Sequence, residues 1–182
     1  MFRITSERPA ELPSEVVDGP LFQGVPRAQR IAFLSELSYF SADPSTVLFS
    51  EGEPGDTLWI ILNGSVTLTR RTDAGELLEL DRARQGDLFG ELALISPAPR
   101  ATTATTLQET DLLVLNRSRN KKLLAERNPA AEALLRYITL RVCRRLRQTD
   151  ARIALVHDAL RGASAAQLDA RVATLNQLGT YS

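Results

Sequence analysis

The spacing of hydrophobic residues changes near residue 116. Between residues 47 and 115, short apolar runs such as 57–62 and 65–69 are separated by turn-forming clusters, and some alternate with polar residues. This pattern is typical of short strands in a sandwich or a jelly-roll-like barrel. The Asn63-Gly64 pair between two runs is expected to form a hairpin turn. After Asn116 the apolar residues recur at helical spacing. The sequence therefore predicts a mainly β fold with flanking helices.

Three helices are predicted outside the β region. Residues 26–37 open with Pro26 and place three apolar residues on one helical stripe. Residues 117–126 form a second, short helix. The third runs from 130 to 160, with Asn128 as its N-cap and Pro129 in its first turn. Gly162 is expected to end it, and Ser164 to cap a short last helix.

These boundaries divide the chain into four parts. Residues 1–20 form an N-terminal extension, expected to be partly disordered or a short leading helix. Residues 21–127 form the β-roll with its flanking helices. Residues 128–161 form the long helix, and residues 162–182 form a short C-terminal helix and tail.

Composition narrows the class of protein. The 182 residues include 22 Lys and Arg and 22 Asp and Glu, so no global field draws the chain to nucleic acid or to a membrane. No apolar run is long enough to cross a bilayer, and the N-terminus lacks a signal-peptide core. Cys143 is the single cysteine, so no internal disulfide can form. We expect a cytoplasmic protein.

A barrel of this size could also be a metal-dependent enzyme of the cupin type. Such a site needs two or three histidines and a carboxylate on the strands. The chain has one histidine, His157, which falls in a helical segment and is expected to be a surface or interhelical residue. The sequence therefore predicts no catalytic residues, no metal site and no cofactor.

The chemistry is concentrated in residues 89–103. Gly90 permits close approach of another group, and Glu91 starts a short helical turn whose free N–H groups favour an anion. Arg100 follows Pro97-Ala98-Pro99 and can hold a phosphate with two parallel hydrogen bonds. A carboxylate and a guanidinium around an amide nest suit a ligand with a phosphate and a hydroxyl. Alternatively, Glu91 and Arg100 pair with each other on the surface.

This segment resembles the phosphate-binding cassette of the cyclic nucleotide-binding domain family, found in bacterial catabolite activator proteins and in regulatory subunits of cyclic-AMP-dependent kinase. Gly52, Gly55 and Gly64 around residues 58–61 resemble the family's N-terminal β signature. Gly86-Asp87 resembles its turn before the cassette, so the resemblance runs from about residue 21 to 160. These glycines could equally serve only as turn residues.

The resemblance implies roles for individual residues. Glu91 would accept a hydrogen bond from the ribose 2′-hydroxyl. Arg100 would hold the cyclic phosphate together with the backbone amides near Leu92 and Ala93 and at Ala101. Thr102 departs from the alanine that is usual in the family, and the alanine after Arg100 resembles cyclic-AMP-type sites. Cyclic AMP is therefore the first choice, with cyclic GMP possible. The predicted ligand-binding residues are Phe89, Gly90, Glu91, Leu92, Ala93, Arg100, Ala101, Thr102 and Thr149.

The long helix carries a second pattern. Six residues recur at spacings of 4, 3, 4, 3 and 4, as in the seam of a coiled coil: Val142, Leu146, Thr149, Ile153, Val156 and Leu160. In the family, the equivalent helix forms a parallel dimer and covers the ligand's base, and Thr149 matches the residue placed against adenine. Thr149 could instead be a tolerated polar seam residue. Leu134, Leu135 and Ile138 are expected to pack on the chain's own barrel.

The family's transcription factors continue with a winged helix-turn-helix of roughly 70 residues. Here 20 residues follow Gly162. We therefore expect a free-standing, homodimeric sensor that does not bind DNA directly and signals to a separate effector protein. Two alternatives stay open: a ligand-independent interaction module with a degenerate form of this fold, and a receptor for a cyclic dinucleotide such as c-di-GMP.

Overall fold

The computed structural model describes residues 2–3, 8–162, 164, 166–167, 169–170 and 173. The chain divides into two compact units, Met1–Leu134 and Leu135–Ser182. The first unit holds the strands and the short helices. The second holds most of the long helix.

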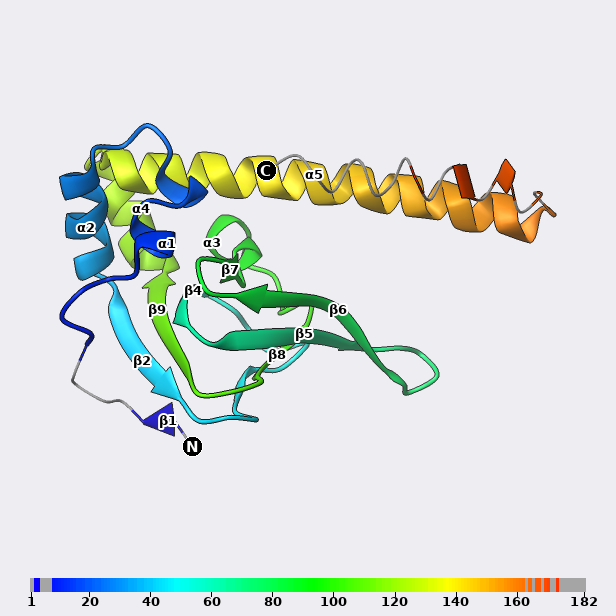
Figure 1. Ribbon diagram of the computed structural model, residues 1–182, viewed down its shortest axis with the longest axis horizontal. Coiled ribbons are helices and arrows are strands. Elements are labelled where there is room, and N and C mark those ends of the chain that lie inside the picture. The colour runs from blue at the N-terminus through cyan, green and yellow to red at the C-terminus, as the bar shows by residue number, and fades with distance from the viewer. Residues whose placement is uncertain are drawn as a thin grey trace. The chain divides into compact units, whose positions relative to one another are not determined.

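Two antiparallel sheets form the β-roll of the first unit (Figure 1). In the described part of the chain, one sheet has the strand order β1-β2-β9-β4-β7 and the other β3-β8-β5-β6. The strands are β1 (Phe2–Arg3), β2 (Ser38–Ala42), β3 (Val47–Phe49), β4 (Thr57–Asn63), β5 (Ser65–Arg71), β6 (Leu77–Arg84), β7 (Leu88–Phe89), β8 (Thr103–Thr106) and β9 (Thr110–Asn116). The predicted fold class, a β-roll with flanking helices, is confirmed.

The helices of the first unit agree with the sequence pattern. Residues 26–37 contain α2 (Arg27–Ser35), and residues 117–126 contain α4 (Arg117–Ala125). Shorter elements are α1 (Ser14–Val17), the 3-10 helix η1 (Pro20–Phe22) and α3 (Leu92–Ile95). None of the described helices combines the length and apolarity needed to span a bilayer.

The long helix α5 (Pro129–Leu160) begins where the sequence predicts. The Asn128 Oδ1 atom accepts hydrogen bonds from the amides of Ala130 and Ala131, at 3.0 and 3.2 Å. These bonds satisfy two of the N–H groups that a helix start leaves without partners. Gly162 follows the helix with a φ of +80°, the left-handed conformation of a helix end.

The Asn63-Gly64 hairpin prediction is wrong. Strand β4 belongs to the five-stranded sheet and β5 to the four-stranded one, so the chain changes sheets at Gly64. Gly64 has a φ of +94°, and a Cβ atom there would lie 2.5 Å from Thr110 Oγ1. An Asn-Gly pair indicates a tight turn both in a hairpin and where the chain passes from one sheet to the other. Whether the next strand turns back on β4 or pairs elsewhere depends on partners distant in sequence.

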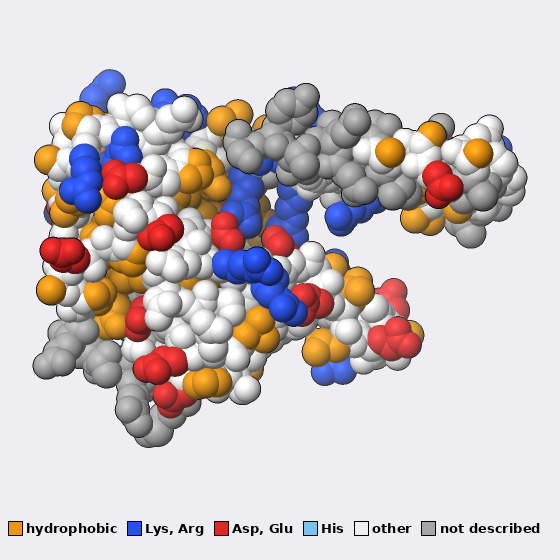
Figure 2. Space-filling view, in the orientation of Figure 1, with side chains coloured by type: hydrophobic (Ala, Val, Ile, Leu, Met, Phe, Trp, Pro, Cys, Tyr) orange, Lys and Arg blue, Asp and Glu red, His pale blue; other side chains and the backbone are white. Residues whose placement is uncertain are grey.

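The hairpin forms instead between β5 and β6, where Arg71 pairs with Leu77. Strand β6 lies at the edge of its sheet, and Leu77, Leu78 and Leu80 are exposed on it. Figure 2 shows hydrophobic side chains at the end of this hairpin, interspersed with charged ones.

Burial on both faces of strand β4 explains why residues 57–62 form a continuous apolar run in the sequence. Alternate residues Trp59 and Ile61 pack inside the roll with Phe89 and Val114. Leu58 and Ile60, on the opposite face of β4, are also fully buried. A strand covered on both faces loses the alternation of polar and apolar residues.

Where it is described, the N-terminal extension contains a strand in addition to the short helix that the sequence allows. Strand β1 pairs antiparallel with β2, and α1 buries Val16 and Val17. The predicted C-terminal helix lies mostly outside the described residues. Where described, Ser164 accepts a bond from the Gln167 amide, and the Ser164 amide bonds to Gln167 Oε1 at 3.0 Å, a reciprocal cap.

Candidate functional site

The segment between β7 and β8 is built around two glycines and one arginine. Gly90 has a φ of +70°, and a Cβ atom there would lie 2.7 Å from Arg100 Nη1. A Cβ atom on Gly55 would lie 2.6 Å from Arg100 Nε. Any side chain at either position would meet the Arg100 side chain. These two glycines therefore do more than form turns, because they make room for the guanidinium.

The Arg100 guanidinium is held by neutral groups. Nη1 donates to the carbonyl oxygens of Thr57, at 2.8 Å, and Gly90, at 3.2 Å, and Nη2 donates to Thr57 Oγ1 at 2.6 Å. The guanidinium carbon lies 4.0 Å from the centre of the Phe49 ring, a cation–π contact. Arg100 is 8 % exposed, and its Nε is buried without a hydrogen-bond partner.

Arg100 and Glu91 do not form a surface ion pair. Both are buried, at 8 % and 6 % exposure, and no salt bridge joins either to another residue in the described part of the chain. Burial lowers the pKa of Arg100, and the nearby charges of Asp56, Glu53 and Glu91 oppose that shift. A desolvated cation without a contacting anion is costly, and a bound anion would relieve that cost.

Glu91 precedes the helical turn α3, as the sequence predicts. The Leu94 amide donates to the Glu91 carbonyl and the Ala93 amide to the Gly90 carbonyl. None of the described hydrogen bonds uses the amides of Leu92 or Ala101. Two of the amides expected at the anion site, those of Leu92 and Ala101, therefore remain available to a ligand. The Ala93 amide is already used in the hydrogen bond to Gly90.

Arg117 holds the segment between β7 and β8 in place through hydrogen bonds to backbone carbonyls. The sequence analysis did not identify this residue. Its Nε donates to the carbonyl oxygen of Ala93 at 2.6 Å, and its Nη2 donates to those of Gly55, at 2.7 Å, and Ser96, at 3.4 Å. Arg117 is the first residue of α4, where a cation is unfavourable to the helix dipole. That conflict was a signal in the sequence that this side chain serves another contact.

Residues 39–127 match the model of the family described as "Cyclic nucleotide-binding domain". The chain is also 34% identical, with a TM-score of 0.63, to the N-terminal domain of a transcriptional regulator from Streptomyces coelicolor A3(2). That match covers 75% of this chain and 92% of the other. The chain belongs to the cyclic nucleotide-binding domain family. The resemblance inferred from the cassette is confirmed.

The curated relatives are regulatory proteins by name. Over 134 residues the chain is 35% identical to the CRP-like cAMP-activated global transcriptional regulator of Mycobacterium tuberculosis, covering 74% of this chain and 58% of the regulator. It is 28% identical over 106 residues to a cAMP-dependent protein kinase regulatory subunit of Dictyostelium discoideum, covering 57% and 32%. The chain thus spans 58% or less of these relatives. It carries a cyclic nucleotide-binding regulatory domain.

One further solved structure supports the fold alone. The catabolite activator protein of Thermus thermophilus gives a TM-score of 0.70 at 22% identity, over 88% of each chain. The match indicates that the arrangement of strands and helices is shared, and it says nothing of the ligand.

The structure places eight of the nine predicted ligand residues in one segment of the first unit. Phe89, Ala93 and Thr102 are buried, whereas Leu92 and Ala101 are exposed. Thr149 belongs to the second unit, is exposed and donates to the Arg145 carbonyl at 2.9 Å. Its contact with a ligand stays a prediction.

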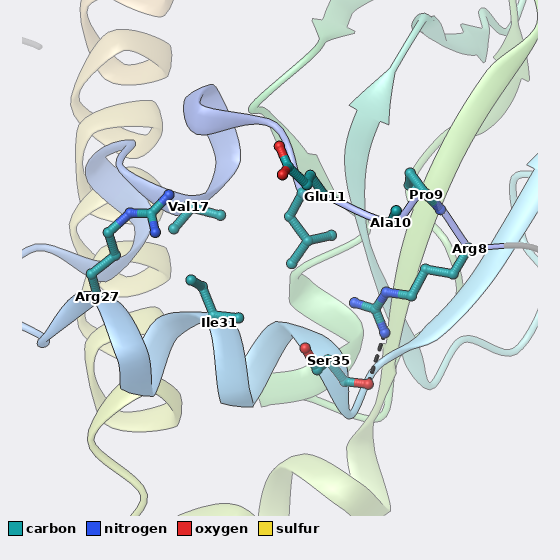
Figure 3. Close-up of a pocket in the computed structure, with 9 residues that line it drawn as sticks. Arg8, Pro9, Ala10, Glu11, Val17, Arg27, Ile31 and Ser35 are labelled. Atoms are coloured by element: carbon teal, nitrogen blue, oxygen red, sulfur yellow. Dashed lines mark hydrogen bonds between the residues drawn. The ribbon is translucent and has the colours of Figure 1, made fainter.

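Two further hollows lie in the first unit, and Arg100 lines neither of them. One, of about 430 Å³, borders the cassette loop and Arg117, with Pro54, Pro97 and Pro99 in its wall. The other, of about 530 Å³, lies between the N-terminal segment and α2 (Figure 3). There Arg8 donates to the carbonyl of Ser35 at 2.7 Å, and Arg27 pairs with Asp18. Arg8 is half-buried and Arg27 is exposed, whereas Arg100 is buried.

The described residues contain no group of His, Cys, Asp and Glu side chains that could hold a metal ion. His157 lies on α5 beside Asp158 and is exposed, as expected.

Proposed function

We propose that this chain is a sensor that binds a cyclic mononucleotide, with cyclic AMP as first choice, and catalyses no reaction. The observation that carries the proposal is Arg100, a buried guanidinium with uncharged hydrogen-bond partners, on which the charge of the buried carboxylate Glu91 acts. The names of two relatives support cyclic AMP, since one is cAMP-activated and the other is a subunit of a cAMP-dependent kinase.

Each group of the ligand has a counterpart in the cassette or on α5. The cyclic phosphate contacts Arg100 and the amides of Leu92 and Ala101, and the ribose 2′-hydroxyl donates to Glu91. Phe89, Gly90, Ala93 and Thr102 form the surrounding wall, and Thr149 approaches the base from α5. Opposite ends of the sugar-phosphate ring then meet opposite charges, and the burial of Arg100 strengthens the contact with the phosphate.

Calorimetric titration of Arg100→Ala with cyclic AMP tests this assignment. Removing the charged partner of a buried phosphate is expected to weaken affinity at least about 30-fold. Arg119→Ala is the matched control, because Arg119 is a surface residue paired with Glu36 and should leave affinity unchanged. Unchanged affinity in folded Arg100→Ala contradicts the proposal.

The same titration with cyclic GMP and c-di-GMP separates the other possibilities. Preference for cyclic AMP agrees with Ala101 after the arginine. Preference for c-di-GMP makes the chain a cyclic dinucleotide receptor. Absence of binding by all three nucleotides indicates an interaction module that uses the fold without a ligand.

We infer that α5 carries the signal as a parallel homodimer. Its apolar seam is exposed in the single chain: Leu146 is 61 % exposed, Ile153 63 % and Val156 58 %. With Leu146 at a heptad a position, Arg145 is at g and Asp150 at e. In a parallel pair, g faces the e position five residues later in the other helix, so Arg145 meets Asp150 of the second copy. An antiparallel pair would place g residues opposite each other.

Sedimentation velocity tests the dimer. Arg145→Glu would place two like charges at each contact and should weaken association, whereas the Arg145→Glu, Asp150→Arg double variant restores it. Arg144→Glu is the matched control, because Arg144 lies at the f position, away from the seam. Equal association of Arg145→Glu and Arg144→Glu contradicts the parallel pairing. A ligand-dependent change at α5 would then be read by a separate effector protein.

A further inference from the structure

Trp59 is a second residue of this region with an unused hydrogen-bond donor. It lies on β4 and is 8 % exposed, with its ring stacked on Phe89 at a centroid distance of 6.2 Å and an interplanar angle of 11°. The ring centroid of Phe40 lies 6.0 Å from that of Trp59. Its indole Nε1 is buried and has no acceptor among the described residues. Buried donors are nearly always paired, so this one requires an explanation.

The sheet directs the indole toward the cassette. Trp59 pairs in register with Phe89 of β7, the residue directly before Gly90. A Cβ atom on Gly90 would lie 3.4 Å from Trp59 Cδ1 and 2.7 Å from Arg100 Nη1. Cδ1 is bonded to Nε1, so the edge of the ring that carries the N–H lies beside Gly90. The Trp59 edge and the Arg100 guanidinium therefore approach the same residue.

Packing alone does not account for a tryptophan at this position. Phenylalanine would provide an aromatic face for Phe89 and Phe40 without burying an N–H. Arg100 Nε is also buried without an acceptor. Two unpaired donors, on two side chains that both approach Gly90 and with no anion to receive them, indicate that the missing acceptors arrive with a ligand.

We propose that Trp59 donates its indole N–H to an oxygen of the sugar-phosphate ring of the bound nucleotide. The proposal rests on the proposed function and adds a ligand contact from β4 to those from the cassette. A sugar-phosphate oxygen is the acceptor because the ring edge lies on the side of Arg100, which holds the phosphate. The contact recognises the part that all cyclic nucleotides share, so it contributes to affinity and leaves the choice of base unchanged.

Trp59 is the single tryptophan of the chain, which makes the test direct. In the ¹⁵N-labelled wild-type protein, the one indole N–H resonance should shift downfield on addition of cyclic AMP, and its exchange with solvent should slow. Trp59→Phe, which keeps an aromatic ring, should lose about five- to tenfold in affinity for both cyclic AMP and cyclic GMP by calorimetry, as expected for one hydrogen bond.

Phe40→Leu is the packing control, because it alters the second aromatic contact of Trp59 and leaves the indole N–H in place. It should bind cyclic AMP within about twofold of wild type and retain the resonance shift. If Trp59→Phe binds as tightly as wild type and the indole resonance does not move while cyclic AMP binds, the inference is overturned and the proposed function stands. If wild type binds no cyclic nucleotide, both are overturned.

Discussion

The β-roll and the second half of α5 satisfy their hydrophobic residues in opposite ways. In the roll, Leu58, Ile60 and Leu112 are fully buried by contacts within the same chain. In α5 beyond Ile138, large apolar residues are mostly exposed, with Leu140 at 60 % and Ile153 at 63 %. The roll therefore has its core within one chain. The helix has an apolar face that one chain leaves uncovered, and such faces mark interaction sites.

Charge separates the two regions as well. Residues 1–134 carry fourteen Lys and Arg and nineteen Asp and Glu, whereas residues 135–182 carry eight and three. The net charge of the chain is therefore zero although the first unit is acidic and the second is basic. Since the flank of the α5 seam is rich in arginine, a partner for it must supply carboxylates, as Asp150 of a second copy does in the proposed dimer.

The largest difference between the two regions should appear on truncating one leucine in each. Leu58→Ala removes fully buried contacts and should lower the free energy of unfolding of the roll by about 2–5 kcal/mol, measured by urea denaturation. Leu146→Ala should leave the unfolding of the roll unchanged and instead weaken self-association in sedimentation experiments. A loss of roll stability in Leu146→Ala would mean that its exposed face is not reserved for a partner.

Arg117 and Arg119 provide a smaller contrast within one helix. Arg117→Ala removes two short charged hydrogen bonds and one longer one, to the carbonyls of Ala93, Gly55 and Ser96, and should cost about 2–3 kcal/mol of unfolding free energy. It should also weaken cyclic AMP binding, because α3 loses its anchor. Arg119→Ala removes a surface pair with Glu36 and should cost under about 1 kcal/mol. Equal effects of the two substitutions would contradict a special role for Arg117.

Thr57 tests how far the site depends on an oriented guanidinium. Thr57→Val keeps the shape of the side chain but removes the hydroxyl that accepts from Arg100 Nη2, so cyclic AMP affinity should fall about five- to tenfold in calorimetry. Thr57→Ser keeps the hydroxyl and should bind within about twofold of wild type. If both variants bind alike, the hydroxyl does not position Arg100.

The smallest effect is expected where α5 begins. Asn128→Ala removes the side-chain oxygen that accepts from Ala130 and Ala131 and should destabilise the chain by about 1 kcal/mol. Asn128→Asp keeps an acceptor and should restore most of that loss. Thermal unfolding of the two variants measures the difference, and equal melting temperatures would show that this cap contributes nothing.

Local sequence determined the elements and the chemistry of the cassette. The helix starts depend on neighbouring residues, so Pro26, Asn116 and Asn128 marked α2, α4 and α5 to within a residue or two. The Gly90-Glu91 start of a helical turn and the arginine after a proline pair are likewise local, and they were readable without coordinates. The seam of α5 follows from its period alone.

Tertiary structure decided which of these pieces meet. The Asn63-Gly64 turn changes sheets because β5 finds its partners in β6 and β8, residues that no local pattern identifies. The cassette is contacted by residues from strands and a helix that lie up to 51 positions away in sequence from Arg100, namely Phe49, Thr57, Trp59 and Arg117. These contacts matter because the fold buries them. An unpaired donor can be recognised only after the fold has removed water from it, because in an extended chain every N–H is solvated.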